Sequence, residues 1–320
     1  MKIELSRLGF GLSSIAGSGN FAHQEKLIKT AIDCGITHFD VAPYYGSGDA
    51  EKILGDILST CKDQVTITTK FGLMPLAAGR GGSLLRSALR PVFRRMRFLK
   101  HIASSMVSKA HQPKTFSFEK GALETSINAS IKKLGRPADI FLLHDAEIDL
   151  AQNPDLTEEL YKVKEAGKTR LTGISGTADM VLQIFNWNPQ LYEVAQLENS
   201  LTSSAPIEAL ERGGADVINH RAIQGGLSQI LFLLQNRPTF KEIWLREVGV
   251  DLHDKESIAN ILIELALYEN RAGTILFSTT NPDRIKKIAR VLASPQLGME
   301  GCLTVRSIFS DVYVDSLKML

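Results

Sequence analysis

The chain alternates short apolar runs with longer amphipathic stretches, and this alternation constrains its fold more than any other feature. The apolar runs are not broken by regularly spaced polar residues, which is typical of strands buried on both faces of a parallel sheet. We expect eight such strands, at residues 8–12, 37–41, 65–69, 140–143, 171–174, 192–197, 216–219 and 274–277. Apolar residues recur with helical spacing at 24–33, 51–58, 123–134, 156–166, 258–268 and 285–292.

Strand–helix repeats predict an α/β protein, and eight of them predict a (β/α)8 TIM barrel with a parallel eight-stranded sheet. An open, doubly wound sheet would produce the same alternation, so the periodicity leaves both architectures open. No stretch rich in Pro, Gly and Ser divides the 320 residues. We therefore interpret residues 1–320 as one domain, which barrels of this type routinely form at this length.

The composition is ordinary for a globular protein, with 44% hydrophobic and 22% charged residues. A formal net charge of +2 gives no electrostatic reason to expect nucleic acid or a membrane as a partner. No apolar stretch approaches the roughly 20 residues of a membrane span, and the first residues lack the pattern of a signal peptide. The three cysteines (Cys34, Cys61 and Cys302) fit neither a disulfide framework nor a zinc site. These features predict a cytoplasmic protein.

One stretch, at about 73–117, interrupts the repeat between the third and fourth expected strands. The chain has no Asp or Glu between Gln64 and Phe118, whereas Arg and Lys are frequent there. A loop of this length inside a domain is usually functional or partly disordered. Two interpretations are open: a solvated, mobile insertion, or a lid that favours anionic cofactor phosphates or substrates.

Four residues that can carry chemistry end or follow the buried strands. Asp40 closes the second expected strand, and Tyr45 follows in the next loop. Lys70 and His144 end the next two strands. In a parallel barrel the polar residues at the carboxyl ends of the strands converge on the face that holds the active site. We therefore expect Asp40, Tyr45, Lys70 and His144 to share one pocket.

These residues carry a resemblance to the aldo-keto reductases. The sequence Asp-Val-Ala-Pro-Tyr-Tyr-Gly at 40–46 is similar to the family's Asp-Thr-Ala, two residues, then Tyr-Gly. Thr-Lys-Phe-Gly at 69–72 resembles the family's strand-ending lysine, and Leu-Leu-His at 142–144 its strand-ending histidine. The resemblance covers nearly the whole chain except the basic insertion. It implies an oxidoreductase in which a hydride passes between a nicotinamide cofactor and a small carbonyl or alcohol substrate.

The chemistry of carbonyl reduction suggests a role for each of the four residues. Hydride delivery leaves an alkoxide that must be protonated, and Tyr45 is the expected general acid and base. An unperturbed phenol has a pKa of about 10, so the ammonium of Lys70 is expected to stabilise phenolate and to lower that pKa. Asp40 would keep Lys70 charged, and a neutral His144 would orient the carbonyl oxygen.

Each of these residues also has a simpler interpretation. Tyr44 could supply the phenol in place of its neighbour, although the spacing of the resemblance leaves Tyr44 to line the pocket. Asp40 and Lys70 alone could be a structural ion pair. His144 alone could be a core histidine, and Asp145 either its orienter or a solvated loop residue. The joint occurrence of the four residue types favours the catalytic interpretation.

No GxGxxG motif lies between an expected strand and helix, so a Rossmann domain is not predicted. The resemblance implies instead a cofactor that lies extended across the barrel mouth. Gly11, Ser175 and Gln196 are expected contacts, the last two holding the nicotinamide amide. Gly176 stands where the family usually has Asn, which removes one amide partner.

The family also stacks an aromatic ring on the nicotinamide after the seventh strand, where this chain has Asn-His-Arg at 219–221. Either another ring or a planar side chain covers that face, or the cofactor lies differently. Arg221 is included among the expected cofactor contacts.

The eighth strand and the helix after it are expected to hold the phosphate end of the cofactor. Ser278, Thr279 and Thr280 supply hydroxyl groups, and Asn281 or its neighbours would cap a helix whose N-terminus attracts anions. Arg284 matches a position where the family often has Arg beside the adenosine 2′-phosphate, although Ser278 replaces a lysine of many relatives. We therefore expect NADP(H) to be favoured over NAD(H), with a plain helix cap as the alternative.

Two other functional classes remain in competition with the reductase. The first is a non-catalytic cofactor-binding sensor or scaffold on the same barrel, which the departures at Gly176 and 219–221 favour. The second is a lyase that uses Lys70 as a Schiff-base amine. A metalloenzyme is not expected, because the seven histidines show no ligand spacing. Aldehydes, ketones and sugars all fit the predicted reaction. The residues after Met299 are partly apolar and are expected to pack against the barrel.

Overall fold

The computed structural model describes residues 3–61, 63–72, 118–201, 203–250 and 254–317. The basic insertion expected at about 73–117 lies outside the described residues.

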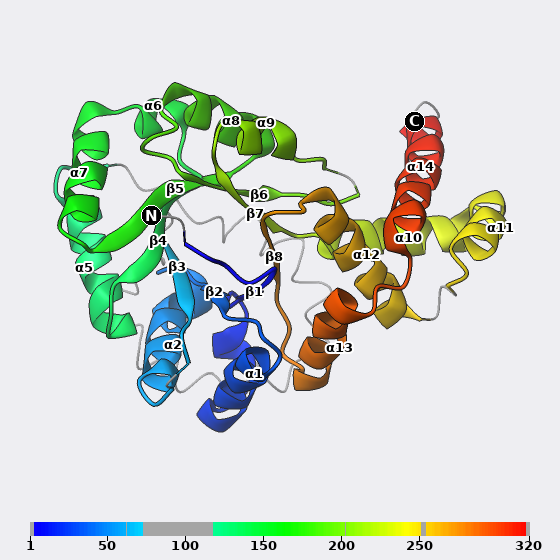
Figure 1. The fold of residues 1–320 in the computed structure, drawn as a ribbon, viewed down its shortest axis with the longest axis horizontal. Helices are drawn as coiled ribbons and strands as arrows, with labels where there is room; N and C mark the ends of the chain where they lie inside the picture. Colours follow the sequence, from blue (N-terminus) through cyan, green and yellow to red (C-terminus); the bar gives the residue numbers. More distant parts are fainter. Residues whose placement is uncertain (1–2, 62, 73–117, 202, 251–253, 318–320) are drawn as a thin grey trace, which may run out of the picture.

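Eight parallel strands form a closed barrel in which each strand pairs with its neighbours in chain order (Figure 1). Pairing of the first strand with the eighth closes the sheet. The closed barrel confirms the TIM-barrel prediction and excludes the open, doubly wound sheet. The strands are β1 (Leu8–Gly11), β2 (His38–Asp40), β3 (Thr66–Phe71), β4 (Ala138–His144), β5 (Thr169–Gly176), β6 (Val194–Glu198), β7 (Asp216–His220) and β8 (Thr274–Phe277).

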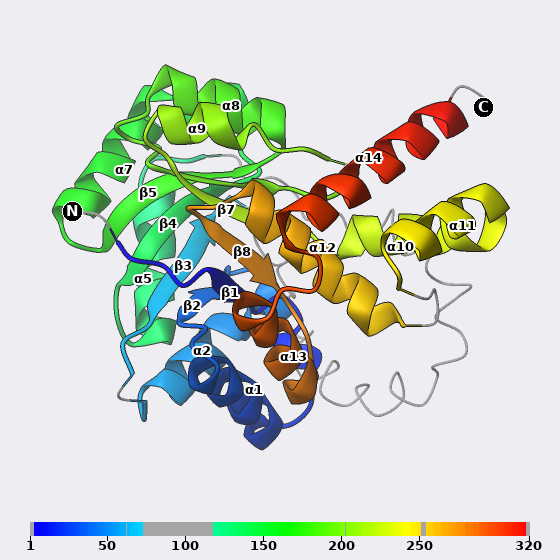
Figure 2. The ribbon, with the colours of Figure 1, turned by 45° about the vertical axis from the view of Figure 1, so that its right-hand side comes forward.

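Helices surround the barrel, as βαβ connections between parallel strands require (Figures 1 and 2). All six helical stretches expected from periodicity are present within a few residues of their expected bounds. The described helices are α1 (Phe21–Asp33), α2 (Ala50–Leu58), α5 (Ala122–Leu134), α6 (Ile148–Ala151), α7 (Pro154–Glu165), α8 (Ala178–Trp187), α9 (Ile207–Arg212), α10 (Gln224–Asn236), α11 (Pro238–Glu247), α12 (Lys255–Glu269), α13 (Pro282–Ala293) and α14 (Gly298–Leu317), with the 3-10 helices η1 (Ile15–Gly17) and η2 (Tyr45–Gly48).

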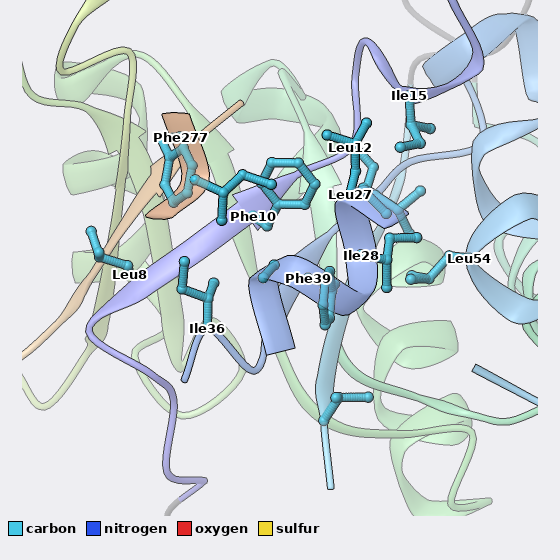
Figure 3. Close-up of a cluster of buried hydrophobic side chains, with 14 of the residues drawn as sticks. Leu8, Phe10, Leu12, Ile15, Leu27, Ile28, Ile36, Phe39, Leu54 and Phe277 are labelled. Carbon is cyan, nitrogen blue, oxygen red and sulfur yellow. The ribbon is translucent and has the colours of Figure 1, made fainter. Parts of the chain in front are cut away.

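A core of buried side chains fills the space between the strands and the outer helices. Phe10 of β1 contacts Phe277 of β8, with ring centres 5.6 Å apart, and Leu27 and Ile28 reach the same cluster from α1 (Figure 3). Burying one such side chain stabilises the fold by about 1.5–3 kcal/mol. The apolar stripe of α1 that the sequence predicted is therefore the face that attaches this helix to the barrel.

The interior of the barrel is filled by the alternate side chains of the same strands. In β4, Phe141 and Leu143 pack with the outer helices, whereas Ile140 and Leu142 cluster with side chains from β6, β7 and β8. Because successive side chains of a strand point to opposite faces, His144 points inward like Leu142. The alternation thus delivers His144 to the carboxyl-terminal mouth of the barrel.

A further apolar cluster lies beside the barrel, among α10, α11, α12 and α14 (Figures 1 and 2). Phe240 and Trp244 of α11 stack with ring centres 5.8 Å apart and are almost fully buried. The residues after Met299 form most of α14, and Cys302, Val305, Ile308 and Phe309 pack in this cluster, where α14 contacts α11 and α12. Because α12 leads into β8, and Arg306 donates to the carbonyl oxygens of Ser200 and Leu201 after β6, this segment packs on the barrel as expected.

A titratable group that the proposed chemistry does not use lies inside the barrel. The ring of His38 lies 2.9 Å from Thr66 Oγ1 through Nδ1 and 3.3 Å from Thr68 Oγ1 through Nε2. Burial lowers the pKa of His38 from 6.5 to about 4. His38 is therefore neutral in the folded protein at neutral pH.

We expect acid to destabilise the protein through His38. The unfolded chain binds a proton at this residue below a pH of about 6.5, but the folded protein does so only near pH 4. Stability is therefore complete above the unfolded pKa and is lost as the pH falls, by about 3 kcal/mol at pH 4. Urea unfolding at pH 7 and pH 4.5 measures this loss, which should shrink in His38→Gln and persist in His23→Gln. A His38→Gln variant with an unchanged pH dependence would contradict the prediction.

Candidate active site

The barrel topology brings the four predicted catalytic residues together at the carboxyl ends of β2, β3 and β4. Asp40 and His144 are the last residues of β2 and β4, Lys70 lies near the end of β3, and Tyr45 begins η2. Asp40 is 3% exposed, Lys70 1% and His144 8%. These charged and polar groups are buried side by side, so their contacts with one another decide their properties.

The ammonium of Lys70 lies at the centre of the site. Its Nζ donates to Asp40 Oδ1 at 2.6 Å, to the carbonyl oxygen of Val41 at 3.3 Å and to the Tyr45 hydroxyl at 3.4 Å. It also lies 4.9 Å from the centre of the Tyr45 ring. One cation is thus held between a carboxylate and a phenol, as the sequence analysis expected.

The second oxygen of Asp40 is bonded from the opposite wall of the barrel. Gln196 Nε2 donates to Asp40 Oδ2 at 2.7 Å, and Ser175 Oγ donates to Gln196 Oε1 at 2.9 Å. Ser175 and Gln196 are the residues expected to hold the cofactor amide, and their connection to the Asp40–Lys70 pair was not predicted from the sequence. The expected cofactor contacts and the proton-handling groups therefore belong to one buried hydrogen-bond network.

Burial and charge act in opposite directions on the two groups that can exchange a proton. Burial lowers the pKa of Lys70, but attraction to Asp40 and Tyr45 outweighs it, so the net pKa is raised and the ammonium persists. Burial and the charge of Asp40 raise the pKa of Tyr45, and together they outweigh the lowering effect of Lys70. The net pKa is therefore raised, which corrects the expectation that Lys70 would lower it. At neutral pH the site therefore holds a protonated amine and a protonated phenol.

His144 is neutral and keeps one ring nitrogen available. Burial, followed by the charge of Lys70, lowers the pKa of His144 to about 3. Its ring meets that of Tyr45 edge to face, with centres 6.1 Å apart. Nδ1 is buried without a hydrogen-bond partner among the described residues, and Nε2 lies 4.0 Å from Asp145 Oδ2, beyond hydrogen-bond range. A neutral imidazole with free polar atoms beside a phenol can orient a carbonyl oxygen.

Unusual backbone conformations surround this pocket. Gly72, just after β3, has a φ of 131°, and a Cβ there would lie 2.7 Å from the carbonyl oxygen of His144, so only glycine fits. Asp145 and Arg221, which directly follow β4 and β7, have φ values of 51° and 60° although they are not glycines. Such left-handed residues concentrate at functional sites.

Two residues at the end of β7, His220 and Arg221, also lie near the site, although only Arg221 was an expected cofactor contact. Arg221 Nη1 lies 3.2 Å from Glu198 Oε2, so the expected cofactor contact is paired with a carboxylate of β6. His220 lies two residues after the inward-facing Ile218 in β7, so its side chain points to the same face of the strand. Burial, followed by the charge of Arg221, lowers the pKa of His220 to about 4, and the charges of Asp40 and Lys70 also act on it. Strand alternation would have identified this imidazole.

Other departures from the family pattern have local explanations. A Cβ at Gly176 would lie 2.1 Å from Met180 Cε, so a side chain there requires Met180 to move. Asn219 is fully buried; it donates to the carbonyl oxygen of Leu197 and accepts from Asn270 at 2.8 Å. A Cβ at Gly11 would make only ordinary contacts, so packing alone does not require glycine at this expected cofactor contact.

The predicted phosphate-binding residues lie between β8 and α13. Asn281 caps α13 by accepting from the backbone N–H of Asp283 at 2.9 Å, which confirms the predicted helix cap. Thr279 Oγ1 accepts from the backbone of Asn281 at 3.2 Å, and Ser278 Oγ lies 3.0 Å from Ser14 Oγ, while Thr280 is exposed. Three residues with hydroxyl groups therefore directly precede the cap of a twelve-residue helix.

Arg284, in the first turn of α13, is 59% exposed, and its Nε lies 3.6 Å from Glu256 Oε1. Lys287 contacts the same carboxylate. The guanidinium is thus held near the cap by a single surface carboxylate that it shares with another cation.

Comparison with known proteins identifies the family. The model of the aldo/keto reductase family matches residues 7–307. The chain belongs to this family. An aldo-keto reductase of Gibberella moniliformis is 28% identical over 182 residues, and one of Bacillus subtilis is 28% identical over 181. Each match covers 54% of this chain and 44% of the relative, so the chain spans less than half the length of these curated relatives.

Solved structures of the family share the fold over nearly the whole chain. The glycerol dehydrogenase of Gluconobacter oxydans is 19% identical, with a TM-score of 0.68 over 97% of this chain and 93% of that one. An aldo-keto reductase of Bacillus halodurans is 16% identical, with a TM-score of 0.69 over 96% and 93%. These likenesses support the barrel architecture.

No cluster of three or more His, Cys, Asp or Glu side chains suited to a metal ion occurs in the described part of the chain. In the same residues, no helix combines the length and the apolar character that crossing a membrane requires.

Proposed function

We propose that this member of the aldo/keto reductase family reduces aldehydes, ketones or sugars with NADPH, and catalyses the reverse oxidation of alcohols. The observation that carries the proposal is the buried contact of Lys70 Nζ with both Asp40 and the Tyr45 hydroxyl, beside a neutral His144. This is the set of groups that protonation of a developing alkoxide requires.

In this mechanism the nicotinamide group supplies the hydride when bound, and the residues of the chain manage the proton. His144 hydrogen-bonds the carbonyl oxygen and holds it near Tyr45. The Tyr45 hydroxyl, protonated at neutral pH, transfers its proton to that oxygen as negative charge develops there. Lys70 stabilises the resulting phenolate, and Asp40 keeps Lys70 charged in its buried position. In alcohol oxidation the same groups return the proton.

The residues present fit such a cofactor. His144, whose buried Nδ1 has no hydrogen-bond partner among the described residues, lies opposite Ser175 in the pairing of β4 with β5. Ser175, Gln196 and Arg221 would hold the nicotinamide end at the barrel mouth, and Gly11 leaves space beside it. Ser278, Thr279 and Thr280 would bind the phosphates, because hydroxyl groups and a helix N-terminus attract anions. We also propose a cytoplasmic location, which the free cysteines among the described residues support.

The structure of the site disfavours the lyase alternative. Schiff-base formation requires an unprotonated amine, whereas the pKa of Lys70 is raised and its ammonium is ion-paired with Asp40.

Some relatives are named for sugar substrates, including a D-threo-aldose 1-dehydrogenase of Pseudomonas and a 6-dehydroglucose reductase of Novosphingobium aromaticivorans. Sugars and short aldehydes are therefore the first substrates to assay.

Cofactor binding tests this proposal most directly. In a fluorescence titration we expect the wild-type protein to bind NADPH more tightly than NADH. The Arg284→Ala variant should lower the affinity for NADPH about tenfold and the affinity for NADH less than about twofold, because only NADPH carries the 2′-phosphate. Arg290→Ala, on the last turn of the same helix, is the matched control and should leave both affinities unchanged.

Failure to bind either nucleotide would reject the oxidoreductase. Equal affinity for the two nucleotides would reject only the NADPH preference. Tight NADPH binding without turnover of any carbonyl compound would favour the cofactor-binding sensor.

A further inference from the structure

A buried carboxylate that the proposed mechanism does not use lies behind the Tyr45 turn. Glu51, in the first turn of α2, is 1% exposed. Thr69 Oγ1 donates to its Oε1 at 2.8 Å, and Lys133 Nζ donates to its Oε2 at 3.2 Å. Because an unpaired buried charge is strongly unfavourable, these two bonds stabilise the Glu51 carboxylate, and they connect α2 with β3 and α5.

Both partners of Glu51 are adjacent to the proposed catalytic groups. Thr69 precedes Lys70 in β3 and faces away from the barrel interior, because side chains alternate along a strand. Lys133 donates in addition to the carbonyl oxygen of Gly48 at 3.2 Å. Gly48 ends the 3-10 helix that Tyr45 begins. One carboxylate therefore connects the strand of Lys70 with the turn of Tyr45.

The Tyr45 turn depends on contacts outside itself. Gly46 and Gly48 have φ values of 61° and 100°, a region that glycine enters freely, so the turn has little stiffness of its own. The contact of the Tyr45 hydroxyl with Lys70 Nζ, at 3.4 Å, lies near the upper limit for a hydrogen bond. A shift of a few tenths of an ångström would therefore break or tighten it.

Backbone packing fixes the position of Lys133. A Cβ at Gly55 of α2 would lie 2.3 Å from the carbonyl oxygen of Lys133, so α2 and α5 are in direct backbone contact at this point. The ammonium of Lys133 consequently approaches Glu51 and Gly48 from a fixed base. The connection between α5 and the Tyr45 turn is built into the packing of the two helices.

We propose that Glu51, through Thr69 and Lys133, is a positioning residue that sets the Tyr45 hydroxyl against the Lys70 ammonium. The proposal rests on the proposed function in one respect, that Tyr45 is the proton donor. A buried ion pair that serves only stability can often be replaced by apolar side chains with little loss in the free energy of unfolding. The pair of Glu51 with Lys133 also connects β3, which carries Lys70, with η2, which carries Tyr45. The separation of these two elements controls proton transfer in the proposed mechanism.

The first test is Glu51→Gln, which keeps the shape and the acceptor for Thr69 but removes the charge that holds Lys133. The pair borders a surface hollow of about 500 Å³ also lined by Phe71 and Ser130, so water can solvate Lys133 and the variant should fold. We expect kcat for carbonyl reduction to fall about tenfold, with KM and NADPH affinity within about twofold of wild type, because misplacement affects the reacting geometry and not binding.

A spectroscopic readout separates positioning from stability. Ionisation of tyrosine phenols is followed by absorbance as the pH is raised. The difference between the titration of the wild type and that of Tyr45→Phe gives the pKa of the Tyr45 phenol. In Glu51→Gln its pKa should rise, because the phenol lies farther from the Lys70 ammonium. Thr69→Val, which removes only the bond to β3, should change kcat and the titration in the same direction. Asp56→Asn on the same helix breaks the exposed pair with Lys52 and is the matched control, expected to change neither.

Wild-type kcat and a wild-type Tyr45 titration in Glu51→Gln and Thr69→Val would overturn the proposal, whatever their thermal stability. An equal effect of Asp56→Asn would overturn it as well. If Tyr45→Phe kept full activity, the assignment of Tyr45 as proton donor would fail, whereas failure to bind either nucleotide would reject the proposed function. The shift of the Tyr45 titration would still decide whether Glu51 positions the phenol.

Discussion

Replacing Tyr45 with phenylalanine is expected to lower kcat for carbonyl reduction about a thousandfold, within the range that general acids contribute. The substitution removes only the hydroxyl that lies 3.4 Å from Lys70 Nζ, and it leaves the ring beside His144. The developing alkoxide then has no positioned proton donor. Steady-state oxidation of NADPH with an aldehyde substrate measures kcat, and fluorescence titration should show unchanged NADPH affinity.

Tyr44→Phe is the control for this experiment, because Tyr44 is the neighbouring phenol that the sequence left as an alternative. Tyr44 immediately precedes η2, and we assign it no proton-transfer role. We expect its variant to retain kcat within about threefold, since no proton transfer is lost. The reverse result, a large loss in Tyr44→Phe and none in Tyr45→Phe, would move the proton donor to Tyr44.

Lys70→Met is expected to lower the free energy of unfolding by about 3–5 kcal/mol, because it leaves the carboxylate of Asp40 buried without its cation. Activity should be lost with it, since the phenolate of Tyr45 would no longer be stabilised. The double variant Asp40→Asn with Lys70→Met removes both charges and should recover most of the stability, but not the activity. Urea unfolding of the two single variants and the double variant measures the coupling.

The exposed pair of Lys52 and Asp56 provides the matched comparison, at 2.8 Å on the surface of α2. Lys52→Met should change the free energy of unfolding by less than about 0.5 kcal/mol, as is usual for exposed pairs. A loss below about 1 kcal/mol in Lys70→Met, or a double variant as unstable as the single one, would contradict the assignment of a coupled, buried pair.

Much of the fold and the centre of the site could be predicted because both depend on local patterns. Unbroken apolar runs such as 140–143 are strands buried on both faces, and a single polar residue at the end of such a run, such as His144, has to appear at the mouth of a parallel barrel. The Asn281 cap could likewise be predicted, because a cap is a contact between neighbours in the chain.

The parts that could not be predicted depend on residues far apart in the sequence. Gln196 and Asp40 are 156 positions apart, and nothing local indicates that the amide bonds the carboxylate. The helices against which α14 packs, α11 and α12, could not be named for the same reason, since the apolar stripe of a helix does not specify the surface that covers it.

The sequence by itself determined the strand–helix repeats and the residue types that end the strands, since these follow from periodicity. Periodicity left an open sheet and a closed barrel as alternatives, and the pairing of β1 with β8 decided between them. Only the tertiary structure decided the electrostatic state of the site. The charges of Asp40 and Tyr45 keep Lys70 protonated against the effect of burial, whereas burial and the charge of Asp40 raise the pKa of Tyr45 against the effect of Lys70. These effects depend on depth and on distances of a few ångströms between separate strands, which no local pattern encodes.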